Sequence, residues 1–153
     1  MSVATTTPPL LLLVDGSSYL YRAYHALPDL RGPRNEPTGA LHGMVAMLTK
    51  LRSQYPAAHA ACVFDAPGKT FRDALYADYK ANRSEMPAPL VEQIAPINEA
   101  VALLGWPVLA LPGIEADDVI GTLARRAAEA GWRRPASGGR CHGFSPMWKG
   151  ALP

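Results

Sequence analysis

Near its start the chain reads Leu10-Leu-Leu-Leu-Val14, an unbroken apolar run between Pro9 and Asp15. A short run that is apolar on both faces and bounded by turn residues is typical of a buried strand in a parallel sheet. Two later runs, residues 60–64 and 108–111, have the same character. Segments with helical periodicity separate and follow these runs, so the sequence predicts an α/β domain with a mainly parallel sheet.

Five helices are expected around this sheet. Ser17 and Thr38 are suited to cap the first two, and Pro96 should interrupt or kink the fourth. Gly39 and Gly43 lie at the start of the second helix, where they could allow close packing or let DNA approach the backbone. The expected ranges are 17–25, 38–55, 70–81, 90–104 and 115–130, the last closed by Gly131.

The chain has 153 residues, of which 48% are hydrophobic and 18% charged, a balance typical of one globular domain. Two cysteines cannot form a disulfide framework, and Cys62 lies in the second apolar run, where a core position is expected. No apolar stretch approaches the roughly 20 residues of a membrane span, and no signal peptide is recognisable. We therefore expect no membrane association and a cytoplasmic location.

The composition changes near residue 131. Residues 1–130 hold 11 basic and 13 acidic side chains, a formal charge of −2, whereas residues 131–153 hold four basic side chains and no acid. Residues 132–153 also contain three prolines and four glycines and lack periodicity. We expect a folded unit over residues 1–131 and an irregular, disordered tail over 132–153, a change that indicates truncation or a frameshift.

Acidic side chains follow all three apolar runs. Asp15 and Asp65 come directly after the first two, and Glu115, Asp117 and Asp118 follow the third at the start of a helix. Because the carboxyl ends of parallel strands meet at one edge of a sheet, five carboxylates should converge there. Carboxylate oxygens suit Mg²⁺ or Mn²⁺, ions that promote phosphodiester hydrolysis. The alternative is that these acids are turn and cap residues, and the pattern leaves both interpretations open.

Basic side chains recur along the helix expected over 70–81. Together with Tyr76 they are spaced by three or four residues and would line one face, next to Phe71, Leu75 and Tyr79. A basic face with neighbouring aromatic rings suits a phosphate backbone and stacked bases, whereas the alternative is a solvent-exposed amphipathic helix. The residues of this basic stripe are Lys69, Arg72, Tyr76, Lys80 and Arg83.

Longer motifs surround these residues. They read, in order, Leu11-Leu-Leu-Val-Asp-Gly-Ser-Ser-Tyr-Leu-Tyr-Arg-Ala-Tyr24, Glu36-Pro-Thr-Gly-Ala40, Val63-Phe-Asp-Ala-Pro-Gly-Lys-Thr-Phe-Arg-Asp73, Tyr79-Lys-Ala-Asn-Arg83 and Gly113-Ile-Glu-Ala-Asp-Asp-Val-Ile-Gly-Thr-Leu-Ala124. Over roughly residues 9–132 the chain resembles the 5′–3′ exonuclease domain of bacterial DNA polymerase I. The resemblance implies a PIN-like or resolvase-like α/β core, incomplete on its C-terminal side.

The same resemblance implies an activity and a site. It implies a divalent-metal-dependent 5′–3′ exonuclease and 5′-flap endonuclease that acts on DNA with a 5′ end or flap and removes RNA primers. The implied metal ligands are Asp15, Asp65, Glu115, Asp117 and Asp118, with Mg²⁺ or Mn²⁺ as the ion. The implied contacts with the scissile phosphate or the displaced strand are Arg22, Tyr79, Lys80 and Arg83, with catalytic roles for Lys80 and Arg83. The basic stripe adds Lys69 and Arg72 to the expected DNA contacts.

The chain departs from the family after Gly131. The family continues into a strand and a Gly-Asp-x-Asp segment with two more metal carboxylates, whereas this chain reads Trp132-Arg-Arg-Pro-Ala-Ser-Gly-Gly139. We therefore expect an incomplete two-ion site. Two interpretations stay open: a metal-dependent 5′ nuclease, and an inactive remnant that binds DNA weakly at most. The sequence does not indicate an oligomeric state.

Overall fold

The computed structural model describes residues 8–57, 59–76 and 85–132. Its centre is a parallel three-stranded sheet formed by β1 (Leu11–Asp15), β2 (His59–Asp65) and β3 (Val108–Leu111), in the order β1-β2-β3. Asp15 pairs with Val63, and Asp65 pairs with Leu111, so the strands end close to one another. This confirms the α/β class and the parallel sheet. No helix among the described residues is long and apolar enough to cross a membrane.

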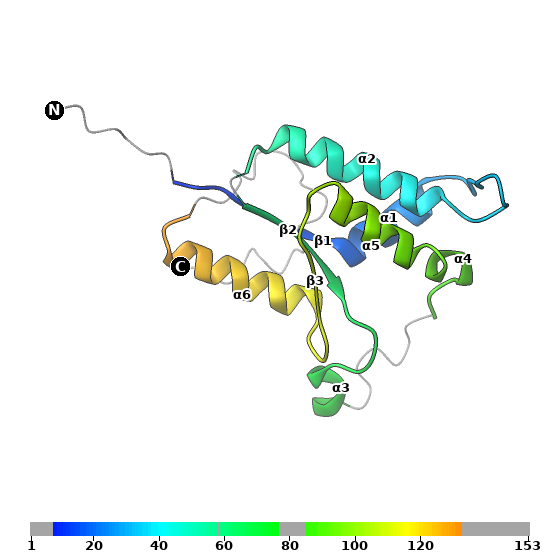
Figure 1. Cartoon of the computed structure of the whole chain (residues 1–153). Coiled ribbons are helices and arrows are strands. Elements are labelled where there is room, and N and C mark those ends of the chain that lie inside the picture. Colours follow the sequence, from blue (N-terminus) through cyan, green and yellow to red (C-terminus); the bar gives the residue numbers. More distant parts are fainter. Residues whose placement is uncertain (1–7, 58, 77–84, 133–153) are drawn as a thin grey trace.

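Helices cover both faces of the sheet (Figure 1). Side chains alternate along each strand, so that Leu12, Val14 and Cys62 face one way and Leu13 and Val63 face the other. The first face packs against α1, α2 and α5, and the second against α6. The helices are α1 (Gly16–Ala26), α2 (Gly39–Gln54), α3 (Phe71–Leu75), α4 (Ala88–Val91), α5 (Ile94–Leu103) and α6 (Ala116–Glu129).

The core lies mainly between the sheet and the α1, α2 and α5 layer. Its largest buried side chains include Trp106, Met44 and Leu48. Cys62 is fully buried there, as expected, and burial raises the pKa of its thiol to about 12, so the group stays protonated and inert. This larger layer fixes β1 and β2, the two strands that end in aspartate.

The two glycines at the start of α2 serve packing. A Cβ at Gly43 would lie 2.7 Å from the Cβ of Ala23 on α1, and one at Gly39 would lie 3.0 Å from the carbonyl oxygen of Pro28. The distance at Gly43 is shorter than real side-chain contacts allow, and the distance at Gly39 is tighter than most of them, so glycine at both positions favours the close approach of α2 to α1 and to the loop before it. Of the two interpretations of these glycines, the structure supports close packing.

Two helix predictions were wrong in their extent. The helix expected over 70–81 ends at Leu75, because Tyr76 has extended backbone angles (φ −137°, ψ 107°). The helix expected over 90–104 is divided into α4 and α5, with the break before Ile94. Pro96 therefore lies in the first turn of α5, where its missing N–H is not needed, rather than at a kink.

The cap of the first helix and the first residue of the expected tail also differ from the sequence predictions. Asp15, not Ser17, caps α1, and Ser17 has another partner.

Trp132, expected to begin the tail, is in contact with the folded part of the chain. Its backbone N–H donates to the carbonyl oxygen of Ala127, and its ring stacks on His59 with 4.6 Å between the ring centroids. Residues 133–153, for which a disordered tail was predicted, lie outside the described residues.

Candidate metal centre

Five carboxylates gather where the strands end. Asp15 ends β1, Asp65 ends β2, and the other three lie at the start of α6. We call Asp15, Asp65, Glu115, Asp117 and Asp118 the acid cluster. Its members act on one another: partial burial, together with the charges of the other four, raises the pKa of Asp117. The convergence expected from the strand ends is therefore present.

Two members of the acid cluster are held by the backbone around them. The carboxylate of Asp15 accepts hydrogen bonds from the Ser18 N–H at 2.9 Å and from the Ser18 hydroxyl. The Asp65 Oδ1 accepts a hydrogen bond from the Ala116 N–H at 2.8 Å, across 51 residues of sequence. These carboxylates lie at the N-termini of α1 and α6, where negative charge is favoured. For these two acids the interpretation as cap residues is therefore confirmed, and each still has oxygen lone pairs for another ligand.

Ser17 ties the first two strand ends together. Its hydroxyl oxygen accepts a hydrogen bond from the Asp65 N–H at 2.8 Å. The contact joins the first turn of α1 to the end of β2, and so fixes the separation of Asp15 and Asp65. Sequence reasoning assigned Ser17 to a helix cap and missed this role, because no local pattern reports a partner 48 residues away.

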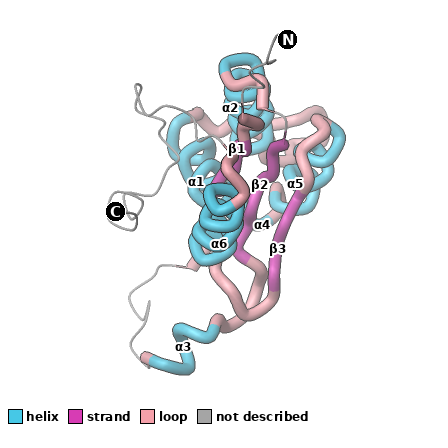
Figure 2. Tube along the Cα trace, turned by 90° about the vertical axis from the view of Figure 1, so that its left-hand side faces the viewer, coloured by secondary structure: helices cyan, strands magenta, loops and turns pink. Residues whose placement is uncertain are grey.

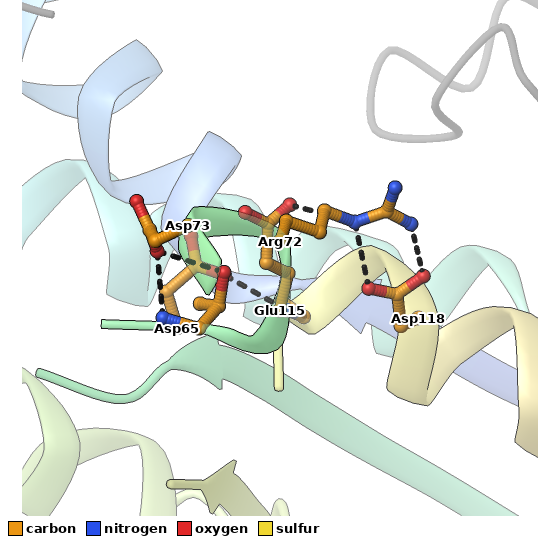
Figure 3. A network of polar contacts seen from close by, with 7 residues as sticks. Asp65, Arg72, Asp73, Glu115 and Asp118 are labelled. Carbon is orange, nitrogen blue, oxygen red and sulfur yellow. Dashed lines mark hydrogen bonds and ion pairs between the residues drawn. The ribbon is translucent and has the colours of Figure 1, made fainter. Parts of the chain in front are cut away.

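Arg72 reaches from α3 into the acid cluster (Figure 3). Its Nη2 lies 2.6 Å from Asp118 Oδ1, and its Nε lies 3.2 Å from Asp118 Oδ2. The same Nε lies 3.8 Å from Glu115 Oε2. Two parallel bonds to one carboxylate form the strong bidentate geometry of arginine. This guanidinium therefore neutralises part of the cluster, and its charge does not face outward as a basic stripe requires.

The donor set suits a hard divalent cation. All five side chains offer carboxylate oxygens, the ligands that Mg²⁺ and Mn²⁺ prefer, and burial together with the charges of the other four acids raises the pKa of Asp117. Within the ranges 8–57, 59–76 and 85–132, however, no three His, Cys, Asp or Glu side chains are arranged to hold one ion. Asp118 has both oxygens on Arg72, so the acids fit a cation by charge and chemistry while one of them is already engaged.

Those residues expected to contact DNA that the structure describes do not share one helix. Lys69 is exposed and precedes α3, and Tyr76 follows its end. Arg22 is exposed on α1, with its guanidinium 5.4 Å from the ring centroid of Tyr19. The basic stripe is therefore absent from the described part of the chain as a single helical face. Tyr79, Lys80 and Arg83 lie outside the described residues.

A local capping pattern was also missed. Asp73 accepts hydrogen bonds from the Thr70 N–H at 2.7 Å and from the Thr70 hydroxyl at 3.0 Å, which forms a capping box at the start of α3. The signal was available as Thr-x-x-Asp at 70–73, although glutamate or glutamine is the usual partner. This cap sets the direction in which α3 presents Arg72.

A family profile described as the 5′–3′ exonuclease, N-terminal resolvase-like domain matches residues 10–134. This chain belongs to the 5′–3′ exonuclease family. It is 58% identical over 120 residues to DNA polymerase I of Pseudomonas aeruginosa, covering 78% of this chain and 13% of that protein. It is 47% identical over 115 residues to a 5′–3′ exonuclease of Buchnera aphidicola, covering 75% of this chain and 38% of the relative.

The fold of this 5′–3′ exonuclease family member is that of a solved phage nuclease. A bacteriophage T5 flap endonuclease in a pseudo-enzyme-product complex with DNA and metal ions superposes with a TM-score of 0.57 at 22% identity. The match covers 79% of this chain and 45% of that one. The chain thus spans less than half the length of these relatives, and at this identity the superposition shows the resolvase-like fold alone.

Proposed function

We propose that this chain is part of a divalent-metal-dependent 5′–3′ exonuclease and 5′-flap endonuclease that acts on DNA. The observation that carries the proposal is the convergence of five carboxylates at the ends of β1 and β2 and the start of α6. Family membership supports the same chemistry. A DNA complex of the phage flap endonuclease favours DNA with a 5′ end or flap as the substrate, and RNA primers on DNA belong to the same proposal.

The acid cluster would hold the cation, with Mg²⁺ or Mn²⁺ preferred because every donor is a carboxylate oxygen. When bound, such an ion makes water a better nucleophile and offsets charge on the phosphodiester. Asp15 and Asp65 are oriented for this task by their hydrogen bonds to Ser18 and Ala116, which limits their side-chain motion. Glu115 and Asp118 complete the ligand set beside Asp117.

Positive side chains would position the phosphate backbone. We assign DNA contact to Arg22 and Lys69, which are exposed, and to Tyr79, Lys80 and Arg83 on the strength of the motif that they share with the family. Lys80 and Arg83 would also offset charge that develops on the scissile phosphate. We propose a cytoplasmic location, which the relationship to a bacterial DNA polymerase supports.

Cleavage of a labelled 5′-flap DNA tests the proposed function. We expect Mg²⁺-dependent cleavage that is lost with EDTA and lowered at least about a hundredfold in Asp117→Asn, because one carboxylate of the cluster is removed. Asp117 is the sharpest choice, since in the described part of the chain it makes no hydrogen bond whose loss would disturb the fold. Glu129→Gln, which removes an exposed acid at the far end of α6, is the matched control.

The outcomes separate the two interpretations of the sequence. Equal rates for Asp117→Asn and the parent chain would assign the activity to a contaminant or to another site. A soluble, cooperatively melting chain without Mg²⁺-dependent cleavage would identify an inactive remnant. Lys80→Ala should slow cleavage more than it weakens metal binding, and an unchanged rate would remove its catalytic role.

A further inference from the structure

The guanidinium of Arg72 contacts two carboxylates of the acid cluster, and the negative charge of the same two carboxylates would attract a bound cation. Its guanidinium makes a bidentate contact with Asp118 and lies beside Glu115, and these two carboxylates are largely shielded, with side-chain exposures of 27% and 11%. A carboxylate with both oxygens on a guanidinium cannot present the same lone pairs to a metal ion. The guanidinium and a divalent cation are therefore alternatives at Asp118.

The element that carries Arg72 is weakly attached. None of the five residues of α3 is buried, and Phe71 and Leu75 have 45% and 68% of their surface exposed. The helix lies apart from the layered core in both views, beyond the carboxyl ends of the strands (Figure 2). The Phe71 N–H does donate to the Gly113 carbonyl oxygen at 3.0 Å, but this bond holds only the start of the helix. Little apolar packing would thus resist a shift of the Arg72 side chain away from Asp118.

We propose that Arg72 is an internal counter-ion of the acid cluster, which holds Asp118 and Glu115 in the metal-free protein and releases Asp118 when a divalent cation binds. The inference rests on the metal site of the proposed function. It assigns Arg72 an inward, competitive role in place of the DNA contact expected from the basic stripe. Arg72 is therefore a positioning residue, because it acts through the carboxylates and not on the substrate.

The test measures Mn²⁺ binding to the full chain by isothermal titration calorimetry, without DNA. Removing the competitor in Arg72→Gln should tighten the apparent Kd for Mn²⁺ by roughly threefold to tenfold. Arg126→Gln removes the same charge from the exposed last turn of α6, about 13 Å along the helix from Asp117 at 1.5 Å per residue, and should leave the Kd unchanged.

Two further variants separate direct competition from a general change in charge. Arg72→Lys keeps the positive charge but loses the bidentate contact with Asp118. This variant should therefore still bind Mn²⁺ more tightly than the parent chain. In an Asp118→Asn background the effect of Arg72→Gln should largely disappear, because its partner carboxylate has gone. Melting curves of each variant without metal confirm folding, and Arg72→Lys carries the test if Arg72→Gln does not fold.

The possible results point in different directions. Tighter binding in both Arg72 variants supports the counter-ion. Saturable Mn²⁺ binding with the same or weaker affinity in Arg72→Gln and Arg72→Lys would overturn the counter-ion and leave the proposed function standing. The absence of saturable binding in the parent and in every variant would overturn the metal site itself, and the counter-ion with it.

Discussion

At the scale of single residues, Asp117 differs from its neighbours in the acid cluster. Asp15 and Asp65 accept hydrogen bonds at helix starts, and Asp118 pairs with Arg72. In the described part of the chain Asp117 has no such partner, while partial burial and four nearby acids raise its pKa. Its negative charge therefore opposes folding when no cation is present.

We predict that Asp117→Asn raises the melting temperature of the metal-free protein at pH 7 by a few degrees at most. A pKa that is raised in the folded state means that stability falls as pH rises through that range. The gain should therefore vanish below about pH 3.9, where the unfolded carboxyl is protonated too. Thermal melting at both pH values, with Glu129→Gln as control, provides the measurement. A lower melting temperature at pH 7 would show that Asp117 has a stabilising partner.

At the scale of secondary-structure elements, α1 and α2 lie in close contact where Gly43 faces Ala23. Gly43→Ala would place a Cβ 2.7 Å from the Cβ and 3.2 Å from the Cα of Ala23. We predict a loss of about 1–3 kcal/mol in the free energy of unfolding, measured by urea denaturation, because overpacking exceeds the gain in helix propensity.

A second glycine provides the control for that experiment. Gly121→Ala on α6 meets no atom within 4 Å, so it should raise the free energy of unfolding by about 0.5–1 kcal/mol. Ala23→Gly should restore part of the stability lost in Gly43→Ala, since it removes the opposing methyl group. If Gly43→Ala were as stable as the parent, the two helices would not be in close contact.

Local sequence patterns predicted the strands and helices that pack into the core. They failed for features that depend on contacts between residues far apart in the sequence. The strands and α6 could be predicted, because apolar runs and amphipathic periodicity record burial directly. The extent of α3 could not, because the helical spacing of the sequence continues past Leu75, whereas the backbone of Tyr76 is already extended. That error also produced the basic stripe, so Arg72 was expected on an outer face rather than against Asp118.

The candidate site was predictable to a similar extent. The convergence of the acids could be predicted from the sequence because they follow the three strands, and the carboxyl ends of parallel strands meet at one edge of the sheet. Contacts such as Ser17 with Asp65, or Asp65 with Ala116, join residues 48 and 51 positions apart, and no local pattern indicates them. The geometry that orients the carboxylates therefore required the structure.

At the scale of the whole molecule, the sheet has two edges. Within the described ranges β1 and β3 each pair with β2 alone, so both present unpaired backbone groups along one side. Leu111 at the end of β3 has 46% of its surface exposed, which adds an apolar side chain at that edge. Open edges of this kind favour pairing with another chain.

We predict that the chain self-associates as its concentration rises, and that Leu111→Lys shifts the onset about tenfold higher, because charge on an edge strand opposes edge pairing. Light scattering coupled to size-exclusion chromatography would report the mass. Leu103→Lys on α5, which removes a leucine with 82% of its surface exposed but away from the sheet, is the matched control. An equal effect of both variants would assign the association to general hydrophobicity instead.

The hydrogen bonds of Asp15 and Asp65 affect what a sequence comparison can reveal. Both acids stabilise helix starts, so natural selection for a folded chain would retain them even in a descendant that had lost its chemistry. Asp117 bears a charge that costs stability without a cation, so drift would remove it early once catalysis no longer mattered. Under the proposed function, an aspartate at this one position is therefore a better sign of a working nuclease among distant relatives than the acids that match Asp15 and Asp65.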